Sequence, residues 1–548
     1  MALRDLFRPK ARVDAAAPEG VTVRIKPHNL PSEQRAGRVV PSFLWWGLLL
    51  ASAFYVAAHF SIVTGVWPQH GTSPGAGGTF VRDGVALAAW IAVLVALRSL
   101  GYRGSWALVV LPIMIFSITR PTQFQIFTDP AYQATGSARA RANDLKATRA
   151  RLTSIERAYS EERRAVVYQG NPPEIPDPFE RAVEREAESR GFIARSAAHF
   201  SVFLAPFALL VGFLLSREPT VMRWVRNRRL IPFIPTLAVF FVLTIGFTKL
   251  GKVGGMTPWE LFLPIFIVIW AATLAEDAYN LARPGAVMEP RRLLNLFLYG
   301  AGPVIPFLII RELGLSIVLA GSLAAMLLVG TRRGWWAGLM LVVWVALVFA
   351  AFNVDERSAT RLELAYDPYK NPAEMTQPEQ ERWAAKLHQM KLFDANVIEG
   401  GLLGEGPGRG HAETAPNAAD DGFITAIATH WGLLGTVSLV LLYTLFVVQL
   451  LSVAAREPGA FERTLVTGVA MLIGIPFWLA TLGGIRLIPL TGVATAFAAH
   501  GGAKLLASAF AVGLAAGVSH RRAREDIMDE ALAPPVGTEP HAKGIRIR

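Results

Sequence analysis

Cysteine is absent from the 548-residue sequence. Its absence excludes a disulfide framework, a thiolate metal site and a cysteine nucleophile. Charged residues are scarce, at 18%, whereas 52% of the residues are hydrophobic. The hydrophobic residues form runs of about 20, the length of a helix that crosses a bilayer, separated by short polar segments. The composition therefore predicts an integral membrane protein with several spans.

Basic residues exceed acidic ones by 54 to 42, which gives a net charge of +12. In a soluble protein this excess would suggest nucleic acid binding, but the cytoplasmic loops of membrane proteins also collect Lys and Arg. We therefore expect the lipid bilayer, and no nucleic acid, among the partners. Residues 1–40 form a basic tail, and the apolar run after it is too long for a signal-peptide core. This pattern predicts a cytoplasmic N-terminus without a cleaved signal.

Twelve candidate spans predict an all-α, polytopic fold. They lie at about 41–64, 83–100, 105–120, 197–216, 230–250, 258–277, 293–310, 312–330, 335–352, 423–451, 462–483 and 494–518. Ten or eleven spans are an alternative, because the third run is short and only Arg311 and Glu312 divide the seventh from the eighth. Arginine clusters fall on one side of the twelve spans, which predicts that both termini are cytoplasmic.

Two long polar segments then lie outside the membrane. The first, 121–196, is rich in Arg, Glu and Ala with apolar residues near heptad spacing, and it predicts a helical hairpin or coiled-coil arm. A solvated spacer is the alternative. The second, 353–422, ends in the loop "GGLLGEGPGRGHAETAPNAADDG" just before the span that begins at Phe423.

Asp420 and Asp421 end this loop, so their carboxylates are expected near the positive N-terminal end of the next helix. One aspartate suffices as a helix N-cap. The other is available for chemistry, and Glu413 lies eight residues before Asp421 with Pro416 between them. Two carboxylates at the bilayer surface suit general-base catalysis or divalent-cation binding.

Other charged residues lie in or beside apolar runs, where they are costly and therefore candidates for function. Glu260 begins one span, and we interpret it as half of an internal ion pair. The break after the eleventh span contains Pro489 and Gly492 and predicts a re-entrant or broken helix, flanked by further candidates. These flanking candidates are Arg486, His500 and Lys504. The alternating glycines of 404–410 predict a flexible or tightly turning loop, from which Arg409 could contact a phosphate.

Four segments, taken in order, resemble the SEDS family (shape, elongation, division and sporulation), the FtsW and RodA class of peptidoglycan glycosyltransferases. They are "TPWEL" at 257–261, "IIRELGLSIVLAG" at 309–321, "ATRLELAYDPYKNP" at 359–372 and the loop of 400–422. The resemblance places a ten-helix core at about 105–518. It leaves 41–104 as an extra pair of spans, 121–196 as an insertion, and 519–548 as a cytoplasmic tail.

The resemblance implies a polymerase that joins lipid II to a glycan strand carried on undecaprenyl diphosphate. It assigns the catalytic aspartate to Asp421 and a supporting glutamate to Glu413, since the spacing to Pro416 and Gly432 leaves Asp420 as the N-cap. The same two carboxylates are the expected ligands of Mg²⁺ or Mn²⁺. The remaining substrate-binding candidates are Arg361, Arg409, Lys504, His500 and Glu260. A class B penicillin-binding protein, which is a transpeptidase, is the expected partner.

The sequence departs from the family pattern at several positions. Thr429 and His430 stand in place of two acidic residues, Thr491 replaces a lysine and His500 replaces a tyrosine. Lys504 or Arg486 could restore a positive charge. Two other interpretations stay open: a flippase for lipid-linked sugars, and a non-catalytic scaffold that recruits a transpeptidase. The flippase would use a polar route of Glu260, Arg311 and Glu312.

Overall fold

The fold was analysed in a computed structural model. It describes residues 42–70, 76–128, 192–227, 236–240, 258–282, 313–352, 376–410, 418–498 and 502–532, with the single positions 300, 302–304, 307, 412 and 415. All regular secondary structure among these residues is helical, which confirms the all-α fold class. Six of the described helices are long and apolar enough to cross a membrane, or seven if one bent pair is counted. The protein is therefore a multi-pass membrane protein, and twelve spans stay a prediction.

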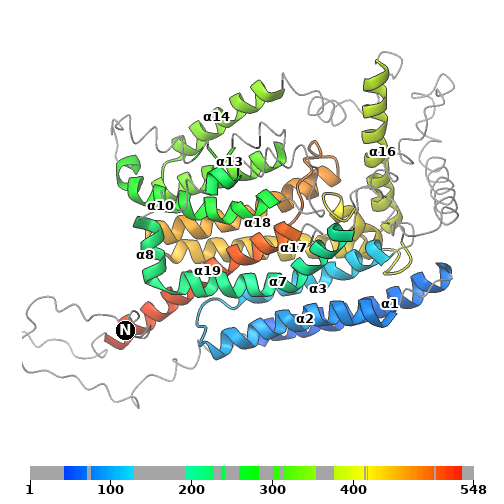
Figure 1. The fold of residues 1–548 in the computed structure, drawn as a ribbon, viewed down its shortest axis with the longest axis horizontal. Helices are drawn as coiled ribbons and strands as arrows, with labels where there is room; N and C mark the ends of the chain where they lie inside the picture. The colour runs from blue at the N-terminus through cyan, green and yellow to red at the C-terminus, as the bar shows by residue number, and fades with distance from the viewer. Residues whose placement is uncertain are drawn as a thin grey trace, which may run out of the picture.

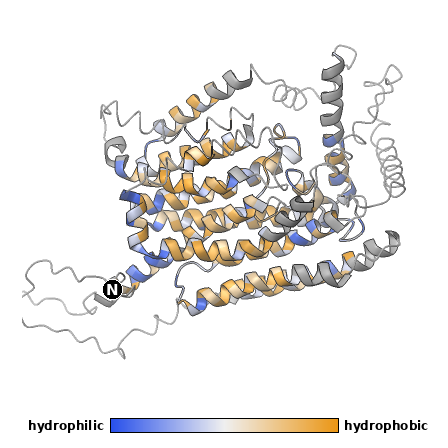
Figure 2. Cartoon of the chain, in the orientation of Figure 1, coloured by the Kyte–Doolittle hydropathy of each residue, from blue (hydrophilic) through white to orange (hydrophobic). Residues whose placement is uncertain are grey.

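The helices form an elongated bundle (Figure 1). Its members are α1 (Ser42–His70), α2 (Ala76–Ser99), α3 (Ala107–Thr128), α7 (Phe192–Arg217), α10 (Leu263–Ala282), α13 (Leu313–Thr331), α14 (Gly334–Phe352), α17 (Phe423–Arg456), α18 (Ala460–Gly484) and α19 (Gly502–Leu532). Hydrophobic residues run along the middle of the bundle (Figure 2). Glycines allow close helix contacts: a Cβ at Gly212 of α7 or Gly513 of α19 would collide with the opposing backbone.

One helix lies across each end of the bundle (Figure 1). At the end where α17 begins, here the α16 end, stands α16 (Gln377–Gly400). At the other, the α8 end, α8 (Pro219–Asn227) bends by 81° from α7. The arginines predicted to share one side gather at the α8 end, as far as the structure describes them. The described members are Arg98, Arg103, Arg217, Arg223, Arg226, Arg332, Arg333, Arg521, Arg522 and Arg524. Arg228, Arg229, Arg283, Arg291 and Arg292, from the same prediction, lie outside the described residues.

Three element boundaries differ from the sequence expectation. Helix α3 continues to Thr128, although the polar segment was expected to start at 121, because the polar side chains of this last part are buried. Segment 353–422 contains α16, which was not predicted because its sequence has no apolar run. The last span begins at Gly502 rather than 494, and the described residues before it, 486–498, are non-helical. The predicted arm falls largely on 129–191, outside the described residues.

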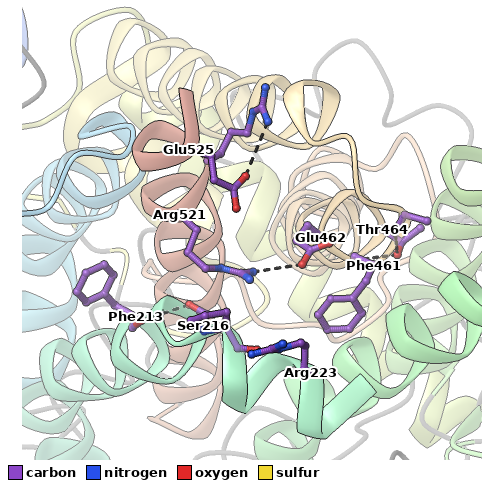
Figure 3. A network of polar contacts seen from close by, with 11 residues as sticks. Phe213, Ser216, Arg223, Phe461, Glu462, Thr464, Arg521 and Glu525 are labelled. Carbon is purple, nitrogen blue, oxygen red and sulfur yellow. Dashed lines mark hydrogen bonds and ion pairs between the residues drawn. The ribbon is translucent and has the colours of Figure 1, made fainter. Parts of the chain in front are cut away.

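A polar network joins the helices at the α8 end (Figure 3). Arg521 of α19 points toward Glu462 of α18, with 3.4 Å between Nη2 and Oε1. Arg522 pairs with Asp526 at 2.7 Å and with Glu525 at 3.8 Å. Beside this network, in the turn between α17 and α18, lies Glu457, which is 6% exposed. Its Oε1 is buried and has no hydrogen bond to the described residues.

Glu457 is expected to make stability depend on pH. Burial, reinforced by the negative charge of Glu462 and opposed by Arg521, raises the pKa of Glu457 from 4.5 to about 7. A raised carboxyl pKa means that the folded state holds the proton more tightly, so this contribution is present below pH 4.5 and is lost as pH rises through 7. At about 1.4 kcal/mol per pH unit, the full shift amounts to roughly 3 kcal/mol.

The test is thermal unfolding in detergent between pH 5 and pH 8. The unfolding temperature of the wild type should fall more steeply over this range than that of Glu457→Gln, which mimics the protonated side chain. Glu218→Gln changes an exposed carboxylate at the same end of the bundle that does not contribute to the raised pKa of Glu457, so it serves as the control and should keep the wild-type slope. Equal slopes for wild type and Glu457→Gln would contradict the assignment.

Candidate active site at the α16 end

Asp421 lies in a tight turn directly before α17, and its side chain is 7% exposed. The N-cap of α17 is Gly422, so the prediction that Asp420 caps this helix is wrong. The carbonyl of Gly422 accepts hydrogen bonds from the backbone N–H and the Oγ1 of Thr425, at 3.0 and 2.8 Å. Asp420 is half-buried. The helix begins at Phe423 as predicted, but its cap lies two residues later than expected, which leaves Asp421 just outside the helix as a buried carboxylate.

The glycine-rich loop of 400–410 packs against an unwound turn of α17. Gly432 has φ +64°, and the carbonyls of Thr429 and His430 accept hydrogen bonds from the loop amides of Glu405 and Gly406, at 2.9 and 3.1 Å. A Cβ at Gly432 would collide with the backbone of Gly404 and Leu402. The glycines are therefore needed for close backbone approach, and the loop is the tightly turning one of the two predicted forms.

The C-terminal part of α3 holds the site loops with buried polar side chains. Gln125 accepts a hydrogen bond from the amide of Gly408 at 2.8 Å and donates one to the carbonyl of Gly410 at 2.9 Å. Gln123 donates to the carbonyls of Ala419 at 2.9 Å and Ala498 at 3.0 Å. The sequence interpretation missed both glutamines. The local signal pointed the other way: "PTQFQ" opens with Pro121, and a proline usually ends or kinks a helix.

Helix α1 also reaches this end of the bundle. Ser61 Oγ donates a hydrogen bond to the carbonyl of Pro407 at 2.9 Å. The ring of Phe54 lies 4.3 Å from that of Trp431, between centroids. The extra N-terminal helix therefore packs against both the glycine loop and α17.

A model of a cell cycle protein family, that of FtsW, RodA and SpoVE, matches residues 191–524, which is more than half of the chain. The chain belongs to this family. These are the SEDS proteins that the sequence resembles. Helices α1, α2 and α3, which contact the site loops or one another, precede the matched residues.

Curated relatives carry the name peptidoglycan glycosyltransferase RodA. The protein of Mycobacterium tuberculosis is 28% identical over 210 residues, covering 38% of this chain and 42% of that one. The protein of Mycobacterium leprae is 29% identical over 269 residues, covering 48% and 56%. The chain thus spans about half the length of the relatives it matches.

Two solved structures are also similar. Thermus thermophilus RodA is 18% identical with a TM-score of 0.36, over 63% of this chain and 95% of that one. A chain from a structure described as a peptidoglycan synthase complex that coordinates polymerization and crosslinking is 18% identical with a TM-score of 0.42, over 60% and 96%.

Two positions at which this chain departs from the SEDS pattern serve packing. Thr429 donates a hydrogen bond from Oγ1 to the carbonyl of Asn396 at 3.0 Å and so ties α17 to α16. Nδ1 of His430 lies 3.4 Å from Oγ1 of Thr122 on α3. Both side chains are almost fully buried, at 0% and 1% exposure. Both side chains therefore occupy tightly packed places between helices.

The two cations that could replace the SEDS lysine each have an acidic neighbour. Lys504 is 1% exposed in the first turn of α19. It interacts electrostatically with the buried Glu260 of η3 (Pro258–Phe262), which packs against α19. Arg486 forms an ion pair with Asp394 of α16. Burial raises the pKa of Asp394, and the charge of Arg486 opposes this shift. The ion pair of Arg486 thus fastens the break between α18 and α19 to α16, and Lys504, at the start of α19, is within electrostatic reach of η3.

Of the remaining predicted site residues, one is described by the structure and the others are not. Arg409 is exposed in the glycine loop and is free to meet a ligand. Glu413, Arg361 and His500 lie outside the described residues, as do Arg311 and Glu312. The described part of the chain contains no group of three or more His, Asp or Glu side chains able to hold a metal ion. Among the described residues, Asp421 is the carboxylate that this site offers to a metal ion. One carboxylate fits Mg²⁺, which usually keeps several water and phosphate ligands and is not enclosed by protein ligands alone.

Proposed function

We propose that this protein polymerises lipid II into glycan strands at the outer face of the cytoplasmic membrane. The observation that carries the proposal is the buried carboxylate of Asp421, which lies at the end of the bundle opposite the arginine cluster of the α8 end. The family supports the reaction class, and the curated relatives named RodA carry the same activity in their names. Arginines collect on the cytoplasmic side of membrane proteins, which supports an outside position for the α16 end and cytoplasmic termini.

Asp421 acts as the general base. Its carboxylate accepts the proton of the acceptor's C4 hydroxyl while that oxygen attacks the donor's anomeric carbon. The bond from this carbon to the diphosphate oxygen breaks, the configuration inverts, and undecaprenyl diphosphate leaves. A general base contributes about 10²–10⁴-fold to such a step. Glu413 orients Asp421 or shares a cation with it.

The departing diphosphate needs positive charge. Arg409 is the exposed described cation in the glycine loop, and Arg361 and Lys504 are further candidates. Mg²⁺ or Mn²⁺, held by Asp421 and Glu413 when bound, would neutralise the developing charge. His500 and Glu260 complete the proposed substrate-binding set. Both substrates are anchored in the bilayer, so a site at the end of the bundle keeps their sugars within reach.

A class B penicillin-binding protein is the proposed partner, because a transpeptidase would crosslink the emerging strand. A scaffold for that partner is the second candidate function, favoured by Thr429 and His430, which pack between helices where the family has acids. A flippase is the third.

Purified protein in vesicles that contain labelled lipid II separates the three functions, with and without the partner. A polymerase gives glycan strands on a gel. A scaffold binds the partner without forming polymer. A flippase moves label across the bilayer without forming polymer, and either of these two outcomes would overturn the proposal.

A further inference from the structure

One side chain joins the loop that ends in Asp421 to the break between α18 and α19. Gln123 of α3 is 2% exposed, and its Nε2 donates to the carbonyl of Ala419 at 2.9 Å and to that of Ala498 at 3.0 Å. Ala419 lies two residues before Asp421, and Ala498 ends the described stretch of the break between α18 and α19. A primary amide has two N–H donors, and Gln123 donates one to each of these carbonyls.

The break between α18 and α19 depends on such contacts for its shape. Phe497 has φ +64°, a conformation that costs a residue with a side chain about 1–2 kcal/mol. Two side chains donate to carbonyls of this stretch: Tyr443 to Ala496 and Gln123 to Ala498. Of these two donors, Gln123 also holds the loop of Asp421.

Loss of the carboxamide would leave two buried carbonyls without their donor. A buried carbonyl without a donor is costly, so the loops would move to find water or new partners. A displacement of about 1 Å at a catalytic group can lower the rate about 10²-fold. The position of Asp421 is therefore sensitive to Gln123. The two residues are far apart in the sequence: Gln123 lies on α3, before the residues that the family model matches, and Asp421 lies in the turn before α17.

We propose that Gln123 is a positioning residue that fixes the loop of Asp421 against the break between α18 and α19. The inference rests on the proposed function for its kinetic consequence, because Asp421 must be the base for its position to set the rate. Its structural consequence, a loop that loosens when the amide is lost, does not depend on that reaction.

The kinetic test compares Gln123→Met, which keeps the length of the side chain and removes both donors, with Val110→Ala. Val110 is buried on the same helix, far from the loops, and its truncation destabilises through a cavity. Gln123→Met should lower kcat for lipid II polymerisation about 30-fold and leave KM within about threefold. Val110→Ala should keep kcat. A wild-type kcat in Gln123→Met, or a change confined to KM, would overturn the inference.

The second test needs no activity and uses the absence of cysteine from the chain. Asp420→Cys places a single thiol on the half-buried neighbour of Asp421. Adding Gln123→Met should raise its rate of modification by a water-soluble maleimide about tenfold, since two lost hydrogen bonds weaken local closure by on the order of 1–3 kcal/mol. Adding Val110→Ala should not. An unchanged rate in the Gln123→Met background sinks the inference.

The two tests keep the failure of this inference apart from that of the proposed function. Polymerisation that survives Asp421→Asn overturns Asp421 as the base, whatever Gln123 does to the thiol. Polymerisation that is lost in Asp421→Asn but kept in Gln123→Met overturns the positioning role alone.

Discussion

Asp421→Asn should lower the rate of lipid II polymerisation by about 10²–10⁴-fold. The amide has nearly the same shape as the carboxylate and keeps a buried polar group in the same turn, but it cannot accept the proton of the acceptor hydroxyl. Asp420→Asn is the matched control. It makes the same chemical change one residue earlier, on a side chain that is half-buried rather than buried, and should stay within about threefold of wild type.

The comparison is made from initial rates at saturating lipid II, with the partner present. The unfolding temperature of each variant shows that the samples are folded. Similar losses in both variants would mean that the turn, rather than the carboxylate of Asp421, is what the reaction needs.

Gly432→Ala should both destabilise the protein and remove most of its activity. The backbone at this position has φ +64°, and the new Cβ would meet the backbone of Gly404 and Leu402, neither of which can turn aside as a flexible side chain could. Strain of this kind together with a backbone collision is expected to cost about 3 kcal/mol or more. The glycine loop must shift, and the hydrogen bonds that join it to α17 are then lost.

Gly401→Ala separates the two causes. Gly401 also has a positive φ, of +50°, but its added Cβ would meet open space. This variant should lose only about 1 kcal/mol and keep its activity. Thermal unfolding in detergent and polymerisation rates, measured on the same preparations, check both expectations. If Gly401→Ala and Gly432→Ala have the same stability and the same activity, the close contact between the loop and α17 is not needed for function.

The sequence predicted the elements whose signal is local. Apolar runs gave the described spans, and the resemblance to the SEDS family singled out Asp421, which the structure buries. It gave the start of α17 correctly and its cap wrongly, because an aspartate just before a helix looks like an N-cap whether or not the chain makes a further turn before the helix begins. It also ended α3 too early, since the burial of its polar residues depends on loops nearly 300 positions away.

Contacts between distant residues could not be predicted. Lys504 was a candidate for restoring a positive charge, and nothing in its own segment indicated that Glu260 on η3 would face it. Gln123 carries no motif, and its role follows from two carbonyls that the fold brings together. The extra helix α1 gave no sign that Ser61 would meet the glycine loop. In each case tertiary packing determined the partner.

The most direct test of Asp421 as the base separates binding from bond formation in one sample. Wild type and Asp421→Asn are each loaded with labelled lipid II, and both the bound fraction and the rate of glycosidic bond formation are measured in a single turnover. The account predicts that Asp421→Asn binds lipid II within about threefold of wild type and forms the bond at least about 10²-fold more slowly. Bond formation at the wild-type rate in Asp421→Asn would contradict it.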